Sequence, residues 1–423
     1  MKRDQSWRAA AVCLALSLLV PWAASADPIK VTWWNIGTAA NDRALNTAFA
    51  DEYMKAHPNV QIDVTVLENE AFKSKLTTVM QSGSPPDLFQ TWGGGVLTEY
   101  GKAGLLKDIT GPVKGSSWYA SQAPGVWQNY SVNGKINAVA TDMGAITFWY
   151  NKDLLAKVGY KTFPTDWDDF LALVKKLKAA GIVPIALGAG DKWPAMHMWS
   201  YIALRLGGGQ LFQDTFSGKN TKGFEDPTFI KAGQVLKDLT ALKPFQDGFL
   251  GATYDDEASL VANGKAAMEL MGQWAPNVQK DKTADKMGLG SKLGSAPFPA
   301  IKGGKGLVTD VIGGGGGYAV GKNASDAAID FLKFLTGKEN QIRMAETSGI
   351  IATAVGAEVG IKDPNAKLVK AIVDKSTFFQ LYLDQFLSPA AGGVVNDSVQ
   401  TILAGTATPA QACAAIQAAY SDK

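Results

Sequence analysis

The chain has 423 residues with 41 basic and 39 acidic side chains, so its formal net charge at pH 7 is only +2. A nearly neutral chain has no bulk electrostatic reason to bind nucleic acid or anionic lipid. Its two histidines also argue against a zinc site, which needs three or four nitrogen or sulfur ligands.

The first 26 residues have the three parts of a secretory signal peptide. Lys2, Arg3 and Arg8 form a basic start, residues 9–22 are an apolar run, and residues 24–26 (Ala-Ser-Ala) match a small-residue cleavage site. We expect cleavage after Ala26 and a periplasmic location, with an uncleaved N-terminal anchor as the alternative. These residues carry three positive charges and one negative charge, a net of +2, so the mature chain is formally neutral.

The remaining cysteine and the histidines are interpreted as structural. Cys13 leaves with the signal peptide, so Cys413 has no partner for an intramolecular disulfide. It lies in an alanine-rich predicted helix and is expected to be a small buried hydrophobe. His57 precedes a proline at a predicted helix end, and His197 lies between two methionines. Hydrophobic cores must therefore hold the chain together, which its length permits.

The mature chain begins with a β-α-β-α-β pattern. Apolar periodicity and turn residues predict strands at 29–34, 60–67 and 87–90, with helices at 41–57 and 71–81. Such alternation predicts a mostly parallel sheet with right-handed crossovers. We expect this segment to open an α/β domain.

A second α/β region follows. Strands are predicted at 145–149, 183–187 and 265–271, and helices at 165–181, 195–206, 226–242 and 257–263. Thr165 is the expected N-cap of its helix, and Asp255, Asp256 and Glu257 are expected to cap the last helix. After residue 326 the pattern is almost purely helical to the end.

Five consecutive glycines, Gly313 to Gly317, precede a short predicted strand at 318–320. This run is not a dinucleotide-binding fingerprint, which has spaced glycines that open a helix. The glycines could let the backbone approach a ligand closely, or they could form a flexible crossover. No nucleophile elbow, phosphate-binding loop or zinc-protease motif is present. We therefore predict no catalytic residues, no metal and no cofactor.

Several of the 12 tryptophans follow predicted strands instead of lying within them. Trp33 and Trp34 close the first strand, and Trp92, Trp193 and Trp274 follow later strands. In open α/β sheets, ligands bind beyond the carboxyl ends of the strands. Aromatic rings there can stack on sugar rings, and neighbouring amides and carboxylates can pair with hydroxyl groups. A single tryptophan would favour the core, but the shared position after strands favours a common pocket.

Short sequence segments also connect the chain with a known family. They are residues 49–60, 83–88, 100–106, 150–155, 163–167, 264–268, 273–274 and 328–349. By their order and spacing the chain resembles the maltose-binding-like family of extracellular solute-binding proteins, the sugar receptors of ABC importers. The resemblance covers essentially residues 29–420.

The resemblance implies an α/β, two-lobed periplasmic-binding-protein fold. Each lobe would hold a mixed, mostly parallel sheet flanked by helices, and the ligand cleft would lie between the lobes. The expected N-lobe comprises residues 27–140 and 313–356, and the expected C-lobe residues 141–312 and 357–423. Strands crossing between the lobes are expected near residues 139–142, 310–316 and 352–361.

The resemblance also assigns ligand contacts to Trp92, Trp193 and Trp274, a hinge carboxylate near Asp142 and a C-terminal aromatic contact to Tyr382. Together with the polar neighbours of the tryptophans and the glycine run, the predicted site is Asn35, Gln90, Trp92, Asp142, Asp191, Trp193, Gln273, Trp274, Gly314 and Tyr382.

The predicted function is binding without chemistry. The receptor would capture a neutral sugar by hinge closure and deliver it to an ABC permease, acting as a monomer with no nucleic-acid partner. Segments 190–194 and 382–385 resemble members that take monosaccharides or short plant-derived oligosaccharides, such as xylo-oligosaccharides. The alternatives are an exported carbohydrate-active enzyme and a receptor for a charged solute such as a polyamine.

Overall fold

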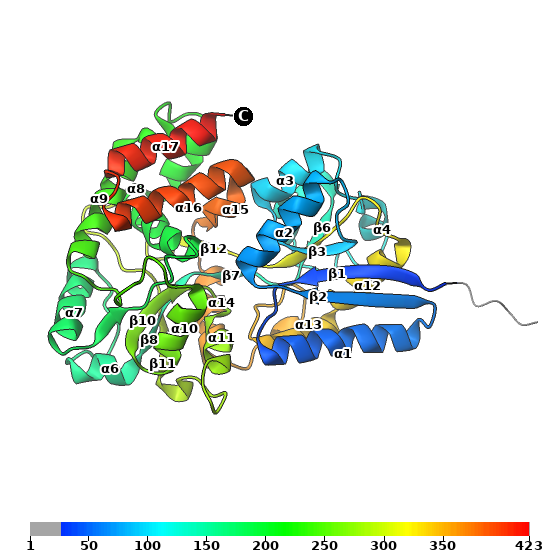
Figure 1. The fold of residues 1–423 in the computed structure, drawn as a ribbon, viewed down its shortest axis with the longest axis horizontal. Coiled ribbons are helices and arrows are strands. Elements are labelled where there is room, and N and C mark those ends of the chain that lie inside the picture. The colour runs from blue at the N-terminus through cyan, green and yellow to red at the C-terminus, as the bar shows by residue number, and fades with distance from the viewer. Residues whose placement is uncertain (1–26, 423) are drawn as a thin grey trace, which may run out of the picture.

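The structure, a computed structural model, describes residues 27–422. The predicted signal peptide lies outside these residues. Figure 1 shows two lobes side by side, with the N-terminal elements in the right-hand lobe and most of the green and red elements in the left-hand one. We call the right-hand part the N-lobe and the left-hand part the C-lobe.

The N-lobe is built on a five-stranded sheet of order β2-β1-β3-β13-β6. Its strands are β1 (Ile29–Asn35), β2 (Val60–Val66), β3 (Leu88–Thr91), β6 (Ala138–Ala140) and β13 (Gly317–Val320), beside a small hairpin of β4 (Ser131–Val132) and β5 (Lys135–Ile136). Its helices are α1 (Ala40–Ala56), α2 (Asn69–Gln81), α3 (Gly94–Lys102), α4 (Thr110–Lys114), α5 (Val126–Asn129), α12 (Asp326–Leu335) and α13 (Lys338–Ser348).

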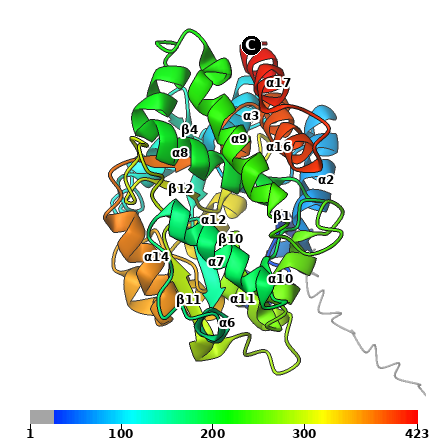
Figure 2. The ribbon, with the colours of Figure 1, turned by 90° about the vertical axis from the view of Figure 1, so that its left-hand side faces the viewer.

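The C-lobe is built on a four-stranded sheet of order β11-β8-β10-β9. Its strands are β8 (Thr147–Asn151), β9 (Val183–Ile185), β10 (Ala266–Met271) and β11 (Leu293–Ala296). Its helices are α6 (Lys152–Lys157), α7 (Trp167–Ala179), α8 (Trp193–Phe216), α9 (Pro227–Ala241), α10 (Tyr254–Ala262), α11 (Ala275–Asp281), α14 (Pro364–Asp374), α15 (Leu383–Phe386), α16 (Pro389–Ala404) and α17 (Pro409–Ser421). Figure 2 shows α8, α9, α16 and α17 at one end of this lobe and α6 and α11 at the other.

A third, three-stranded sheet lies between the lobes, as the labels β7 and β12 in Figure 1 show. It consists of β14 (Phe379–Leu381), β12 (Val311–Gly314) and β7 (Gly144–Ala145). The chain runs from β6 in the N-lobe sheet to β7, and from β12 back to β13 in the N-lobe sheet. At these connections the chain passes between the N-lobe sheet and the three-stranded sheet. The lobe boundaries given above stay a prediction.

The first three strands pair as the β-α-β-α-β pattern predicts. β1 is parallel to both β2 and β3, whereas β13 is antiparallel to β3 and β6. In the C-lobe only β9 and β10 are parallel, because β8 runs antiparallel to both of its neighbours. Both sheets are therefore mixed. The parallel strand pairs are the ones joined by crossover helices, and the sequence predicts these helices.

Two separate hydrophobic cores hold the lobes together. Trp33 of β1 packs edge-on against Phe331 of α12, with ring centroids 5.3 Å apart, in the N-lobe core. In the C-lobe core, Trp199 of α8 stacks on Phe229 of α9 at 5.7 Å. Cys413 is fully buried in the same C-lobe core, as expected for a small apolar side chain.

Several predicted elements differ in detail from the structure. Asp166, not Thr165, caps α7, since its side chain accepts from the backbone of Asp169 at 3.0 Å. The carbonyl of Thr165 instead pairs with the amide of Ala300. The strand predicted at 145–149 is divided between β7 and β8, which belong to different sheets. The C-terminal region is not purely helical, because the three-residue β14 adds a strand too short for periodicity to reveal.

The acidic run before α10 is only partly a cap. Asp256 forms a capping box with Thr253. Glu257 instead points inward and is 1% exposed. Its Oε2 accepts a 2.7 Å hydrogen bond from the amide of Gly188.

The glycine run lies where three chain segments meet between the lobes. A Cβ atom at Gly315 would lie 1.7 Å from the carbonyl oxygen of Asp142, and one at Gly313 would lie 2.3 Å from that of Gly144. The glycines thus allow neighbouring backbone segments to approach closely, and Gly315 and Gly316 also border the pocket between the lobes. Among the described residues, no helix combines the length and apolar character that a bilayer span requires.

Candidate binding site

A pocket of about 280 Å³ lies between the two lobes. The N-lobe contributes residues from the end of β1, the start of α1, the start of α2 and the end of β3. The C-lobe contributes residues from α8, α10, α11 and the segment around α15, and the crossing segments add residues 141–142 and 315–316. The volume is close to the lower end of the range for small-molecule pockets, about 300 Å³. The pocket therefore suits a small ligand held by both lobes.

Aromatic rings form the C-lobe wall of this pocket. Trp193 begins α8, and its ring centroid lies 5.2 Å from that of Tyr254 and 6.3 Å from that of Trp274. Trp274, which precedes α11, lies 6.1 Å from Tyr382. Trp92 lines the pocket from the N-lobe, at the end of β3, and packs edge-on against Phe72 at 6.1 Å. Aromatic faces from both lobes thus border one cavity.

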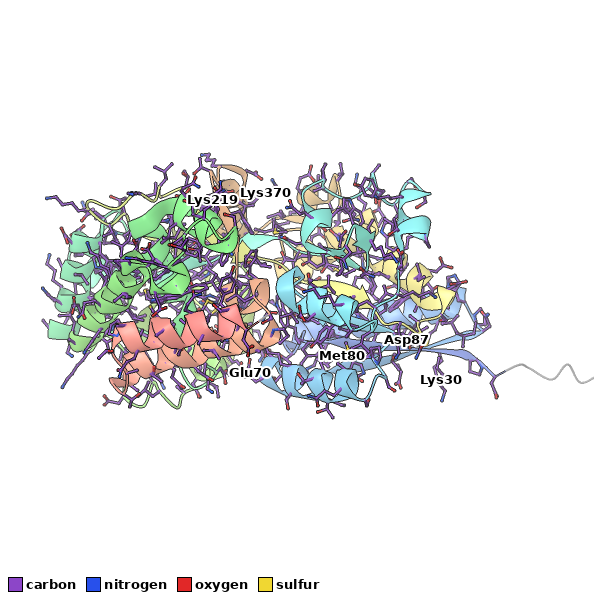
Figure 3. All side chains as sticks on the ribbon, turned by 90° about the horizontal axis from the view of Figure 1, so that it is seen from above. Lys30, Glu70, Met80, Asp87, Lys219 and Lys370 are labelled. Carbon is purple, nitrogen blue, oxygen red and sulfur yellow. The ribbon has the colours of Figure 1, made fainter. Side chains whose placement is uncertain are left out.

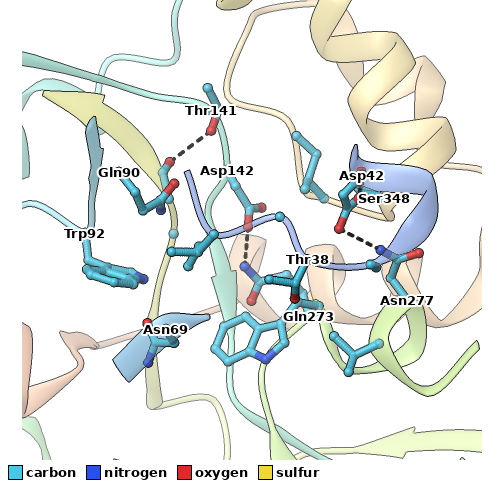
Figure 4. Close-up of a pocket in the computed structure, with 18 of the residues that line it drawn as sticks. Thr38, Asp42, Asn69, Gln90, Trp92, Thr141, Asp142, Gln273, Asn277 and Ser348 are labelled. Carbon is cyan, nitrogen blue, oxygen red and sulfur yellow. Dashed lines mark hydrogen bonds between the residues drawn. The ribbon is translucent and has the colours of Figure 1, made fainter. Parts of the chain in front are cut away.

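Asp142 joins the lobes at the pocket floor. Its Oδ2 accepts from Nε2 of Gln273 at 2.5 Å, and its Oδ1 accepts from the backbone amide of Ile351 at 2.8 Å. Figure 4 shows the Asp142 and Gln273 side chains pointing toward one another. Burial raises the pKa of Asp142 to about 6, although both hydrogen bonds favour the ionised form. Near neutral pH the carboxylate thus serves as a hydrogen-bond acceptor shared between segments of both lobes.

A second link between the lobes lies at the N-terminus of α1. Nδ2 of Asn41 donates to Oδ1 of Asn277 at 2.6 Å, and Nδ2 of Asn277 donates to Oδ2 of Asp42 at 3.1 Å. Ser348 also donates to Asp42. Figure 4 shows Asp42, Ser348 and Asn277 gathered at one side of the pocket. Burial raises the pKa of Asp42 above its usual value.

Charged side chains reach the pocket from α2 and α15. Nζ of Lys73 lies 2.9 Å from Glu70 on its own helix and 3.8 Å from the buried carboxylate of Asp384 in the C-lobe. Seen from above, Glu70 at the start of α2 lies where the two lobes meet (Figure 3). Lys73 therefore adds an ion pair between the lobes beside the pocket.

Seven predicted site residues come together as pocket lining. They are Gln90, Trp92, Asp142, Trp193, Gln273, Trp274 and Tyr382.

Three predicted site residues do not line the pocket. Asn35 lies behind it, where its Oδ1 accepts from the amide of Gly37 and the side chain of Asn46. Asp191 accepts from the backbone amide of Tyr254 at 2.8 Å, which positions that ring. Gly314 backs the ring of Tyr382, since a Cβ atom there would lie 2.6 Å from Cε2 of the tyrosine. Each of the three contacts a residue that lines the pocket.

The sequence interpretation missed several lining residues, among them Asp42, Tyr254, Asn277 and His197. His197 was expected to be structural, yet it lies one helical turn beyond Trp193 on α8 and borders the same pocket. The i, i+4 spacing from a predicted contact residue was the signal that could have identified it. Among residues 27–422, no cluster of three or more metal-ligating side chains is arranged to hold a metal ion.

The sequence of residues 37–342 matches the family of bacterial extracellular solute-binding proteins. The chain belongs to this family. Solute-binding proteins hold their ligands without transforming them, so this chain is a receptor and not an enzyme. The interlobe pocket is the candidate site for its solute.

Curated relatives and solved structures agree with the family. A probable sugar-binding periplasmic protein of Mesorhizobium japonicum is 30% identical over 62% of each chain, so the match spans less than two thirds of that relative. A multiple sugar-binding protein of Streptococcus mutans is 25% identical over 82% of this chain and 81% of its own.

Solved structures extend the likeness over the whole fold. One comes from a study of xylan utilization by Caldanaerobius polysaccharolyticus, with a TM-score of 0.85 and 29% identity, covering 92% of this chain and 99% of that chain. A chitin oligosaccharide binding protein has a TM-score of 0.84 at 24% identity, covering 94% of this chain and 99% of its own. The two-lobed α/β fold is therefore shared with sugar-binding relatives.

Proposed function

We propose that this solute-binding protein is the receptor of an ABC importer and captures a neutral sugar between its lobes. The observation that supports this proposal is the pocket itself, which is lined by Trp92 from the N-lobe and by Trp193 and Trp274 from the C-lobe. Flat apolar rings suit the C–H faces of a sugar ring, and the surrounding amides and carboxylates suit its hydroxyl groups. The names of the sugar-binding relatives support the same ligand class.

The pocket volume of about 280 Å³ favours a monosaccharide or a short oligosaccharide. The relative from a xylan-utilization study supports xylose-based oligosaccharides as the first candidates. The described pocket has a single lysine among its lining residues, Lys73, and that lysine is already placed beside Asp384. This arrangement supports an uncharged ligand over an anionic one.

Capture would proceed by hinge bending at the crossing segments. A sugar bound between the lobes contacts both of them and so stabilises the closed form. Only the difference between its affinities for the closed and open forms can shift that equilibrium. The link made by Asn277 with Asp42 would form as the lobes approach.

We further propose export, cleavage after Ala26, action as a monomer and delivery of the sugar to a membrane permease. The family, whose members are extracellular, supports the location. The permease would be the partner that receives the closed form and accepts its ligand.

The test is a titration of intrinsic tryptophan fluorescence in the mature chain. The panel comprises D-xylose, D-glucose, D-galactose, xylobiose, xylotriose and maltose, with putrescine and amino acids as controls. Saturable quenching or a spectral shift with one of the sugars is the expected result, because Trp92, Trp193 and Trp274 line the pocket. A response to putrescine with silence across every sugar would overturn the sugar assignment in favour of a charged solute.

A further inference from the structure

His197 lies deep in the C-lobe wall of the pocket. Its side chain lines the pocket although the residue is only 2% exposed. Its ring centroid lies 5.6 Å from the ring of Trp193 and 5.6 Å from that of Tyr382. The imidazole therefore sits between two of the aromatic residues that border the ligand space.

Several polar atoms of this wall have no hydrogen-bond partner within the protein. Neither Nδ1 nor Nε2 of His197 has a partner, and the same holds for the hydroxyl of Tyr382, Nε1 of Trp193 and Oε1 of Gln273. A buried polar group without a partner costs about 1–3 kcal/mol, and such groups are rare in folded proteins. Four neighbouring residues of one pocket wall that share this property point to a ligand that supplies the missing partners.

The imidazole is uncharged at neutral pH. Burial lowers the pKa of His197 to about 4, which outweighs the opposing field of Asp384, and Lys73 lowers it further. A neutral imidazole has one N–H donor and one nitrogen acceptor. With the donor of Trp193, the acceptor of Gln273 and the hydroxyl of Tyr382, the wall offers a mixed and uncharged set. Hydroxyl groups, which both donate and accept, match such a set, whereas a carboxylate, which only accepts, leaves its acceptors unpaired.

We propose that His197 is a specificity-determining residue of this pocket, and that it and Tyr382 hydrogen bond the hydroxyl groups of an uncharged sugar ring. The inference rests on the proposed sugar-binding function and deepens it. It selects neutral sugars over uronic acids, because the carboxylates of Asp42 and Asp384 line the same pocket and its lysine, Lys73, already lies beside Asp384.

The decisive variant is His197→Phe, which keeps an aromatic ring between Trp193 and Tyr382 but removes both ring nitrogens. We expect its affinity for the sugar that saturates the wild type to fall at least tenfold. We expect its melting temperature without ligand to stay the same or rise, because two buried unpartnered polar atoms are removed. A merely structural histidine would leave the affinity within about twofold of the wild type, and that result would overturn the assignment.

A second measurement does not depend on any substitution. The chain has only two histidines, so ¹⁵N labelling of histidine gives two sets of ring-nitrogen resonances. His57 stacks on Tyr53, and its Nδ1 lies 2.9 Å from the carbonyl oxygen of that residue, outside the pocket. We expect the saturating sugar to shift the ring nitrogens of His197 and to leave those of His57 unchanged. Unchanged resonances for both histidines would contradict the proposal.

The charge selectivity is tested with D-glucuronate and D-galacturonate beside the neutral panel. We expect each charged sugar to bind at least tenfold more weakly than its neutral counterpart, and equal affinity would overturn the selectivity. If no sugar perturbs the wild-type fluorescence, the proposed function itself fails and this inference falls with it. If the wild type binds and His197→Phe binds equally well, only this inference is wrong.

Discussion

Individual aromatic side chains decide whether the pocket can hold a sugar. Trp193 and Trp274 belong to a group of rings that touch one another and also border the cavity. A tryptophan that only filled the core would contribute to stability but would not face open space. Substitution of these tryptophans therefore tests whether their rings stack on the ligand or only pack in the core.

We expect Trp193→Ala and Trp274→Ala each to weaken sugar binding by about 1–3 kcal/mol, because each removes a stacking face. Titration of the remaining tryptophan fluorescence, or calorimetry, measures the change. Trp34→Ala is the matched control: Trp34 is half-buried under Lys75, whose Nζ lies 4.7 Å from its ring, and it does not line the pocket. Unchanged affinity in the two pocket variants with a lowered melting temperature would identify both rings as core residues.

At the scale of elements, β10 and α10 carry a buried pair of carboxyl groups behind the aromatic wall. Glu269 is fully buried, and its Oε1 accepts from Nε2 of Gln279 at 2.5 Å. The carboxyl group of Glu257 lies close enough to interact with it electrostatically. Burial raises the pKa of Glu269 to about 7, and burial together with repulsion from Glu269 raises the pKa of Glu257 well above its usual value. Two adjacent buried carboxyl groups cannot both ionise without a large cost.

These raised pKa values predict how stability depends on pH. A carboxyl group whose pKa is higher in the folded than in the unfolded chain contributes stability below the unfolded value, about 4.3. That contribution is lost as the pH rises through the folded value, near 7 for Glu269. Glu269→Gln keeps the shape without the titration, so we expect it to unfold at a higher temperature than the wild type at pH 8. The gain should be about 1–3 kcal/mol.

Thermal melts at pH 6, 7 and 8 measure this effect. The wild type should lose stability toward pH 8 more steeply than Glu269→Gln. Parallel pH profiles for the two proteins would show that Glu269 does not titrate in this range.

The glycine run gives a second prediction for an element. Gly315→Ala places a Cβ atom against the carbonyl of Asp142, a backbone atom that cannot move aside. We expect a loss of about 1–3 kcal/mol in unfolding free energy, as for other overpacked sites. Gly393→Ala is the matched control, because no atom lies within 4 Å of its Cβ position on α16, and alanine favours a helix. Chemical denaturation compares the two, and equal stability would mean that the crossing segments can separate.

At the scale of the whole molecule, the proposed hinge closure implies that links between the lobes stabilise a closed form. Asn277 on α11 bonds to both Asn41 and Asp42 at the start of α1. We expect Asn277→Ala to weaken sugar binding by about 0.5–1.5 kcal/mol, the net contribution of an ordinary hydrogen bond. Faster dissociation should account for most of the loss, as is usual for interface variants.

Stopped-flow fluorescence separates the association and dissociation rates of this variant. Small-angle X-ray scattering with and without sugar reports the compaction of the two lobes, which the wild type should show on binding. A variant with an unchanged dissociation rate would show that this link does not hold the lobes together.

The sequence by itself determined the family, the class of fold and the region of the site. Periodic apolar residues mark β1, α1, β2 and α2 because each of these elements buries one face against the same core. The position of tryptophans just after strands identified Trp92, Trp193 and Trp274 as pocket residues, since the carboxyl ends of strands in α/β sheets border the ligand cleft.

Only the tertiary structure decided which further side chains meet there. His197 is on a helix with buried residues at nearly every position, so burial alone does not separate its pocket-facing side from its core-facing sides, and only its i, i+4 spacing from Trp193 pointed to the pocket. Asp42 and Asn277 are 235 residues apart in sequence, and only the approach of the two lobes brings them together. The three-residue β14 exists because β12 lies alongside it. Contacts between segments remote in sequence leave no local pattern, and for that reason they required the folded chain.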